Sequence, residues 1–138
     1  MTHAIRIHEQ GGPDVMHWEE ITVPAPGPGE ALIRQTAVGL NYIDVYQRAG
    51  GYKLDLPASI GMEAAGIVEA VGEGVDTVKP GDRVAYVMGP PGAYAEARVY
   101  PAWRLVPLPD DISDEQSAGM MLKGLTVSYL LRRTYPVK

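Results

Sequence analysis

The segment IGMEAAGIVEAVGEGVDTVKPGDRVAYV, residues 60–87, decides the fold class. It begins with an apolar run over Ile60–Val71 that is rich in Ala and Val, and Gly72-Glu73-Gly74 follows as a turn. Pro80-Gly81-Asp82 is a second turn signal, and it leads into the short run Arg83–Val87. Short apolar runs bounded by Gly and Pro are typical of strands, because these two residues suit turns better than strand interiors. The segment therefore predicts two strands separated by turns.

Most of the remaining chain repeats this pattern. Gly and Pro account for 16 and 12 of the 138 residues, and they separate short segments rather than cluster. Further strands are predicted over residues 3–8, 15–23, 30–40, 93–100 and 103–108. The period changes at Asn41–Ala49, where Asn41 is suited to cap a short helix and Gly50-Gly51 to end it in a left-handed conformation. Many short strands with turns between them favour an all-β barrel or sandwich.

The last quarter of the chain predicts a helix instead. Ser113-Asp114-Glu115-Gln116 has the spacing of a capping box, in which Ser and Gln each bond the other's backbone. From there to Arg133 the chain is rich in Met and Leu at helical spacing. Gly119 and Gly124 weaken this helix, so we expect a kink or a break there, and Pro136 should end it.

Composition excludes several classes of protein. A length of 138 residues, or 14.9 kDa, suits one domain with one core. A net charge of −5 and a pI of about 5.1 argue against a nucleic-acid or anionic-membrane surface. No long apolar run predicts a membrane span, and Met1–Arg6 lacks the apolar stretch of a signal peptide. The chain contains no Cys, which excludes disulfides and thiolate metal sites within it and fits a reducing, cytoplasmic location.

General catalytic motifs are missing from the chain. Gly72-Glu73-Gly74 and Gly27-Pro28-Gly29 lack the third glycine and the following helix of a dinucleotide fingerprint, so both read as turns. His3, His8 and His17 lie in the first two predicted strands, where surface or core positions are a simpler explanation than a metal site. On these grounds alone the chain is a small β domain without an assigned role.

Three stretches carry a resemblance to a known family. Gly39–Gly50 (GLNYIDVYQRAG) resembles the N-x-x-D-x-x-x-R-x-G segment of NADPH-dependent quinone oxidoreductases, the zinc-free branch of the medium-chain dehydrogenase/reductase superfamily. Gly61–Val68 (GMEAAGIV) resembles the superfamily's G-x-E-x-x-G-x-V strand. Met121–Leu131 (MLKGLTVSYLL) is similar to the family's L-K-G-L-T-x-x-Y-L-L helix. The order and spacing hold over essentially the whole chain.

The resemblance implies a domain organisation. Residues 1–112 would form a mainly β, GroES-like partly open β-barrel with short helices, which is the catalytic, substrate-side domain. Residues 113–138 would form a helical segment that leads to a Rossmann cofactor domain beyond Lys138. That domain is absent here, so the chain would be a piece of a longer reductase or a shortened homologue. Because the pyrophosphate of NADPH needs a helix N-terminus of that second domain, we expect the chain alone to be inactive.

The resemblance also implies a metal-free reaction. In zinc-dependent members of the superfamily, a Cys and a His stand at the positions of Asn41 and Met62. An amide and a neutral thioether are poor zinc ligands, so we expect no zinc. A quinone already accepts electrons readily, so orientation of the nicotinamide can replace a Lewis acid. The implied reaction is hydride transfer from NADPH to a quinone or a similar enone.

The family's site residues carry over position by position. Asn41 and Tyr46 would be catalytic, with the Tyr46 ring available for stacking and its hydroxyl near the quinone oxygen. Asn41 and the helix over residues 42–46 would line the nicotinamide cleft. Lys123, Thr126 and Tyr129 would reach the cofactor from one face of the C-terminal helix. The residues thus implied in cofactor binding are Asn41, Tyr42, Ile43, Asp44, Val45, Tyr46, Lys123, Thr126 and Tyr129.

Simpler explanations remain for several of these residues. Asn41 can serve as a helix cap only, and Asp44 with Arg48 has the spacing of an exposed helical ion pair. Lys123 can extend to solvent from an apolar helix. Glu63 needs a hydrogen-bond partner if it is buried, which favours a structural role over acid–base work.

Two further expectations concern the C-terminal helix. Met121-Leu122 and Leu130-Leu131 are predicted to be core residues. Without a second domain, Met121 and Leu125 would be exposed, and we expect a homo-oligomer through that region.

Two other functions stay open. The first is an enoyl thioester reductase of the same superfamily. The second is a non-enzymatic GroES-like binding or structural protein.

Overall fold

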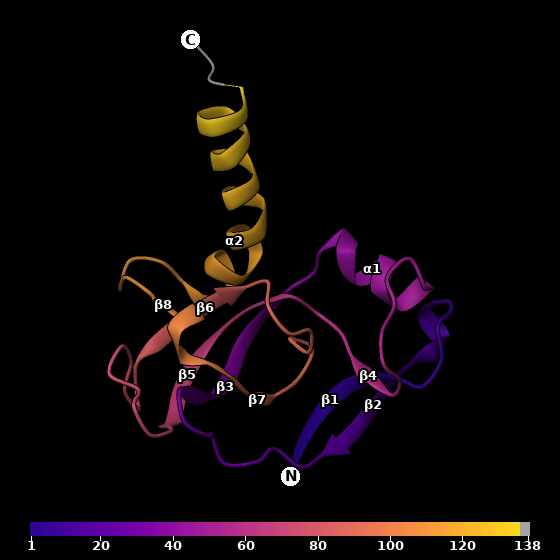
Figure 1. The fold of residues 1–138 in the computed structure, drawn as a ribbon, viewed down its shortest axis with the longest axis horizontal. Coiled ribbons are helices and arrows are strands. Elements are labelled where there is room, and N and C mark those ends of the chain that lie inside the picture. Colours follow the sequence, from indigo (N-terminus) through magenta and orange to yellow (C-terminus); the bar gives the residue numbers. More distant parts are fainter. Residues whose placement is uncertain (136–138) are drawn as a thin grey trace.

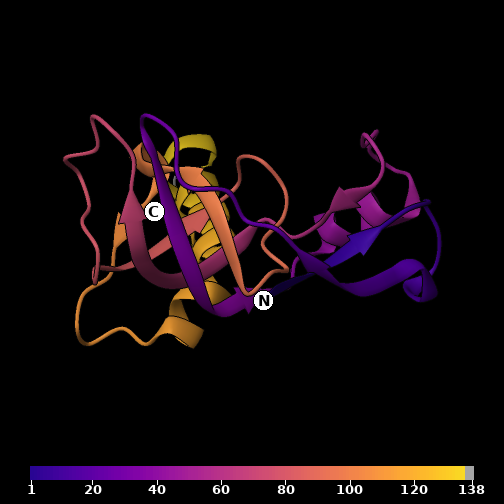
Figure 2. The same ribbon diagram turned by 90° about the horizontal axis from the view of Figure 1, so that it is seen from below.

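The computed structural model describes residues 1–135, and the predicted helix stop at Pro136 lies outside this range. Two antiparallel sheets lie beside each other, as Figure 1 and the view from below in Figure 2 show. They are not closed into a barrel, and the mainly β architecture with short helices and a C-terminal helix agrees with the prediction. The strands are β1 (Thr2–Ile7), β2 (Met16–Ile21), β3 (Glu30–Gly39), β4 (Ala58–Ser59), β5 (Glu63–Val71), β6 (Arg83–Val87), β7 (Ala97–Pro101) and β8 (Val106–Pro107). The helices are α1 (Tyr42–Ala49) and α2 (Asp114–Tyr129), with short 3-10 turns over Pro13–Val15 and Ala102–Arg104 and a π-helical turn over Leu130–Thr134.

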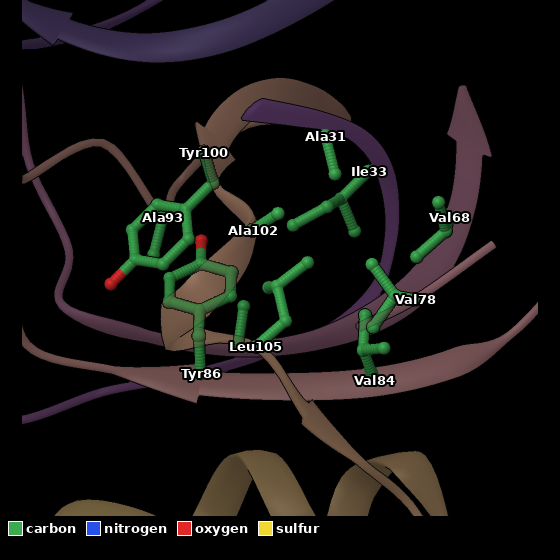
Figure 3. Close-up of a cluster of buried hydrophobic side chains, with 11 residues drawn as sticks. Ala31, Ile33, Val68, Val78, Val84, Tyr86, Ala93, Tyr100, Ala102 and Leu105 are labelled. Carbon is green, nitrogen blue, oxygen red and sulfur yellow. The ribbon is translucent and has the colours of Figure 1, made fainter. Parts of the chain in front are cut away.

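The larger sheet carries most of the core. Its strand order is β7-β3-β5-β6-β8, and the smaller sheet has the order β2-β1-β4. Tyr86 and Tyr100 stack in the core with ring centroids 4.2 Å apart, and aliphatic side chains surround them (Figure 3). The Tyr86 hydroxyl donates to Gln35 and the Tyr100 hydroxyl to the Met88 carbonyl, so neither buried phenol lacks a partner. These two tyrosines provide the large core rings in a chain without Phe.

Two predicted strands differ from the structure. Residues 93–96 do not belong to β7, because their backbone bonds elsewhere: the N–H groups of Ala93 and Tyr94 donate to Gly61 and Ile60. The Tyr94 carbonyl in turn accepts from Ile5 of β1, so this segment ties the two sheets together. Residues 103–108 form a 3-10 turn and the two-residue β8 instead of one longer strand.

Helix α2 begins as predicted but is not interrupted. Ser113 and Gln116 form both hydrogen bonds of the capping box, at 2.9 and 3.1 Å. The helix continues through Gly119 and Gly124, so the expected break at these glycines was wrong. Its first half packs on the sheet, where Ala118 is buried, and the second half projects away from both sheets (Figure 1).

Because the second half of α2 projects from the sheets, a second prediction for this helix also fails. Leu130 and Leu131 are 46% and 47% exposed, so the prediction that they are core residues was wrong. Leu125 is also exposed, as expected, whereas Met121 is partly buried against the sheet. Within the described residues, no helix combines the length and the apolar character that a membrane span requires.

Candidate functional site

A buried carboxylate joins three elements of the predicted site. Glu63 is the first residue of β5, and its side chain is fully buried. One carboxylate oxygen accepts from the Leu122 backbone N–H of α2 at 2.8 Å. The other accepts from Asn41 Nδ2 at 2.6 Å and lies 3.4 Å from Lys123 Nζ. Glu63 is therefore buried with the hydrogen-bond partners that the sequence analysis required of it, and two of these partners, Asn41 and Lys123, are predicted site residues.

Lys123 turns its ammonium group toward the protein. Nζ donates to Asn41 Oδ1 at 2.8 Å and to the Leu40 carbonyl at 3.4 Å. The side chain is still 54% exposed. The alternative in which the lysine only extends into solvent is not what the structure shows.

Gly39 lets α2 approach this cluster. A Cβ atom at position 39 would lie 2.1 Å from the Ala118 carbonyl oxygen and 2.5 Å from Glu63 Oε2. Only a residue without a side chain leaves room for both groups. The end of β3 and the first half of α2 are thus in direct backbone contact beside Glu63.

Helix α1 begins and ends where predicted, and it contains one carboxylate side chain that is unexpectedly buried. It follows Asn41, and Gly50 ends it with a φ of 92°. The Asp44 carboxylate accepts from the Asn41 N–H at 2.9 Å and from the Tyr94 hydroxyl at 2.8 Å. Burial raises the pKa of Asp44, and these hydrogen bonds oppose the rise.

The predicted ion pair between Asp44 and Arg48 was therefore wrong. Asp44 is 2% exposed and faces Tyr94, whereas Arg48 donates to the Gly11 carbonyl at 3.0 Å. Helical spacing alone does not reveal that one of the two side chains points into the protein.

The outer face of α1 carries aromatic rings. Tyr42 and Tyr46 are 70% and 49% exposed, and their ring centroids lie 5.0 Å apart in an edge-to-face arrangement. Tyr52, in the loop after α1, adds a third ring 6.4 Å from Tyr46. The sequence analysis missed Tyr52, although its place directly after Gly50-Gly51 puts it near the helix. Exposed rings in this arrangement suit stacking against a planar ligand.

The other predicted residues of α1 lie on a different side. Ile43 and Val45 are partly buried. Val45 and Asp44 line a small crevice of about 140 Å³ together with Pro13, Met16, Leu40, Arg48, Ile60 and Tyr94. The five consecutive residues 42–46 thus do not form one surface, because a helix distributes them around its axis.

Thr126 and Tyr129 lie on the exposed half of α2. The Thr126 hydroxyl donates to the Leu122 carbonyl at 2.8 Å, and Tyr129 is 57% exposed. Neither residue has a side-chain hydrogen bond to α1 among the described residues. The structure therefore joins Asn41 with Lys123, and it leaves Tyr46, Thr126 and Tyr129 outside that cluster.

The side chains at the two possible metal positions do not fit a zinc ion. Asn41 Oδ1 already accepts from an ammonium group, and Met62 Sδ accepts from Gln47 Nε2 at 3.4 Å. A third candidate ligand nearby, the Glu63 carboxylate, is bonded to the same ammonium group and to two other donors. Both positions are thus occupied by internal hydrogen bonds, and a cation next to them would face the charge of Lys123.

A larger apolar cavity lies next to the end of β3. Its volume is about 560 Å³, and its lining residues are Ile5, Trp18, Gln35, Thr36, Ala37, Val38, Leu40, Tyr94, Ala95 and Glu96. Leu40 is the neighbour of Asn41, but none of the predicted site residues lines this cavity.

Known proteins share this fold and these sequence motifs. The model of the alcohol dehydrogenase GroES-like domain matches residues 27–110. The whole chain is 49% identical to a quinone oxidoreductase of Pseudomonas aeruginosa and covers 43% of it. It is 46% identical to a 2-haloacrylate reductase of Burkholderia sp, again over the whole chain and 43% of the relative.

A solved structure agrees closely with this one. The crystal structure of Escherichia coli quinone oxidoreductase complexed with NADPH superposes with a TM-score of 0.96 at 45% identity. The match covers 100% of this chain and 42% of that protein. The chain thus spans about two fifths of the length of the relatives it matches.

Proposed function

The chain belongs to the alcohol dehydrogenase GroES-like domain family, and we propose that it is the substrate-side domain of a metal-independent NADPH:quinone reductase. Residues 1–112 would be the catalytic domain. Residues 113–138 would lead into a Rossmann domain that binds most of the cofactor. Quinone oxidoreductases that match the whole chain at 45% and 49% identity support this assignment.

The observation that carries the proposal is the hydrogen bond between Lys123 Nζ and Asn41 Oδ1, at 2.8 Å. This hydrogen bond engages the amide oxygen of Asn41, the position at which a Cys ligand is expected in zinc-dependent members, with an ammonium group. A site built in this way supplies no Lewis acid for a simple ketone or alcohol. It suits an acceptor that is electrophilic without such help, and a quinone is one.

The exposed groups around this cluster fit the nicotinamide end of NADPH. NADPH supplies a hydride when it is bound. Asn41 would position the nicotinamide at the start of α1, and of the α1 residues 42–46 the exposed rings of Tyr42 and Tyr46 would be available for stacking. Thr126 and Tyr129 would hold the cofactor from the exposed half of α2, and Lys123 would act on it through Asn41, to which its ammonium group donates.

The proton balance assigns a role to Tyr46. A quinone that accepts a hydride becomes a hydroquinone monoanion and takes up one proton. The Tyr46 hydroxyl, or a water molecule next to it, would donate that proton to the quinone oxygen. Tyr46 is 49% exposed, and a proton that it donates would be replaced from the solvent.

One observation favours a second substrate class. The 2-haloacrylate reductase matches the chain at 46% identity, close to the value for the quinone oxidoreductase. A haloacrylate is an activated alkene, as is an enoyl thioester, and both accept a hydride at carbon. We therefore keep activated alkenes as the alternative substrates.

Steady-state kinetics with the longer protein that contains this chain test the proposal. NADPH oxidation is followed by absorbance with a quinone, an enoyl thioester or 2-haloacrylate, in buffer with a strong chelator. We expect the highest kcat/KM for the quinone, unchanged by the chelator. Preference for either alkene would favour the alternative class, and no turnover with any of the three would favour a binding or structural protein.

A further inference from the structure

We propose that Glu63 is a positioning residue of this site and that Lys123 is its resident counter-ion, so that together they fix the orientation of the Asn41 side-chain amide. The inference rests on the proposed function in treating Asn41 and Lys123 as site residues. It adds a residue, Glu63, that touches neither solvent nor ligand. It also assigns Lys123 a role inside the protein.

The burial of Glu63 calls for a counter-charge. A carboxylate with no exposed surface loses its hydration, and only hydrogen bonds and a nearby cation can replace it. Asn41 Nδ2 and the Leu122 N–H provide two hydrogen bonds, at 2.6 and 2.8 Å. The ammonium group of Lys123, 3.4 Å from Oε2, provides the charge.

These contacts leave Asn41 only one favourable orientation. An amide side chain has a donor side and an acceptor side. Its nitrogen faces the Glu63 carboxylate and its oxygen faces the Lys123 ammonium group. A flipped amide would point oxygen at a carboxylate and nitrogen at a cation, and both contacts would be repulsive. Glu63 and Lys123 thus act on Asn41 as a pair.

The same carboxylate connects Asn41 to α2. Leu122 donates its backbone N–H to Glu63 Oε1, and the next residue is Lys123 itself. Loss of the charge pair should therefore change the signals of two groups: the Asn41 side-chain amide before α1 and the Leu122 N–H in the middle of α2. Asn41 is only 5% exposed, so a bound ligand would not be needed to observe the effect.

NMR of the ¹⁵N-labelled chain without NADPH or quinone tests this directly. In the Lys123→Met variant we expect the Asn41 side-chain amide resonances to shift and the Leu122 N–H to exchange at least about tenfold faster. Lys53→Met is the matched control, because Lys53 is an exposed lysine in the loop after α1, and it should leave both signals in place. Lys123 is half exposed, so its replacement should permit folding.

Chemical rescue separates the charge from the general effect of a mutation. The chain has no Cys, so Lys123→Cys introduces a single thiol. Alkylation of that thiol with 2-bromoethylamine restores an ammonium group at nearly the length of lysine, and iodoacetamide adds a neutral group instead. We expect the ammonium adduct to recover the wild-type Asn41 and Leu122 signals and the neutral adduct to leave them shifted.

Two results would overturn the inference. One is an Asn41 amide that is unchanged in Lys123→Met, and the other is equal recovery by both adducts. Because no measurement here uses a cofactor or substrate, the outcome is independent of whether the longer protein reduces quinones.

Discussion

Replacing Gly39 by Ala should separate α2 from the sheet. The new methyl carbon would lie 2.1 Å from the Ala118 carbonyl oxygen and 2.5 Å from Glu63 Oε2. The first neighbour is backbone and cannot rotate away. To restore even a tight contact of 3.0 Å, α2 must move by about 0.9 Å. A displacement of that size stretches the 2.8 Å hydrogen bond from Leu122 to Glu63.

The expected destabilisation has two sources. Overpacking of a close contact costs about 1–3 kcal/mol. Loss of a hydrogen bond to a charged acceptor adds about 1.5–3 kcal/mol. Because the two effects share one displacement and are not additive, we expect the free energy of unfolding to fall by about 2–5 kcal/mol.

Urea unfolding followed by circular dichroism measures this difference. Gly119→Ala is the matched control, since Gly119 lies inside α2 and a Cβ atom there would meet no heavy atom within 4 Å. That variant should gain up to about 1 kcal/mol from helix propensity. A Gly39→Ala variant within about 0.5 kcal/mol of wild type would refute the close approach of α2 and β3.

Three other predictions concern the site, the first turn of α2 and the exposed half of that helix. Tyr46→Phe should lower kcat/KM for a quinone by about 10²-fold in the longer protein, with Tyr135→Phe as the control; equal kinetics would remove the assigned proton donor. Asp114→Asn should lower stability by about 1–2 kcal/mol at neutral pH, because hydrogen bonds from the Thr36 hydroxyl and from Arg83 hold the pKa of Asp114 below its usual value. A lowered folded pKa stabilises the protein above the ordinary aspartate pKa, so the difference should shrink as the pH falls through the lowered value, and a constant difference in acid would contradict the assignment. Leu125→Glu should reduce self-association through the exposed half of α2 in sedimentation experiments, and Thr77→Glu should not; a wild-type monomer at high concentration would exclude that association.

Local chemistry made much of the fold predictable. The left-handed Gly50 and the Ser113–Gln116 capping box lie where the sequence placed them, because caps depend on neighbouring residues. The strand around Gly66 was also predictable, because its apolar run ends in clear turn signals. By contrast, residues 93–96 bond to Ile60, Gly61 and β1, which are remote in sequence. No local pattern distinguishes such a connection from a continuing strand.

The site likewise combines features that neighbouring residues predict with contacts between residues remote in sequence. The resemblance brought out Asn41 and Lys123, but their contact spans 82 positions of the chain and depends on how α2 crosses β3. Glu63 was conspicuous as an acid in an apolar strand, and the partner it requires became visible only in three dimensions. The Asp44–Arg48 prediction failed because helical spacing does not tell which face is buried.

The attachment of α2 beside Glu63 and Gly39 also has a mechanical consequence. The helix contains 16 residues, and it is held through its first half, up to the Leu122 N–H that Glu63 accepts. The seven residues from there to Tyr129 form a free arm of about 10 Å, so a tilt of about 5° at Leu122 moves the end of the helix by roughly 1 Å. A small rotation of α2 at its contacts with Glu63 and Gly39 therefore displaces the C-terminal end of the helix by more than it displaces the contact itself.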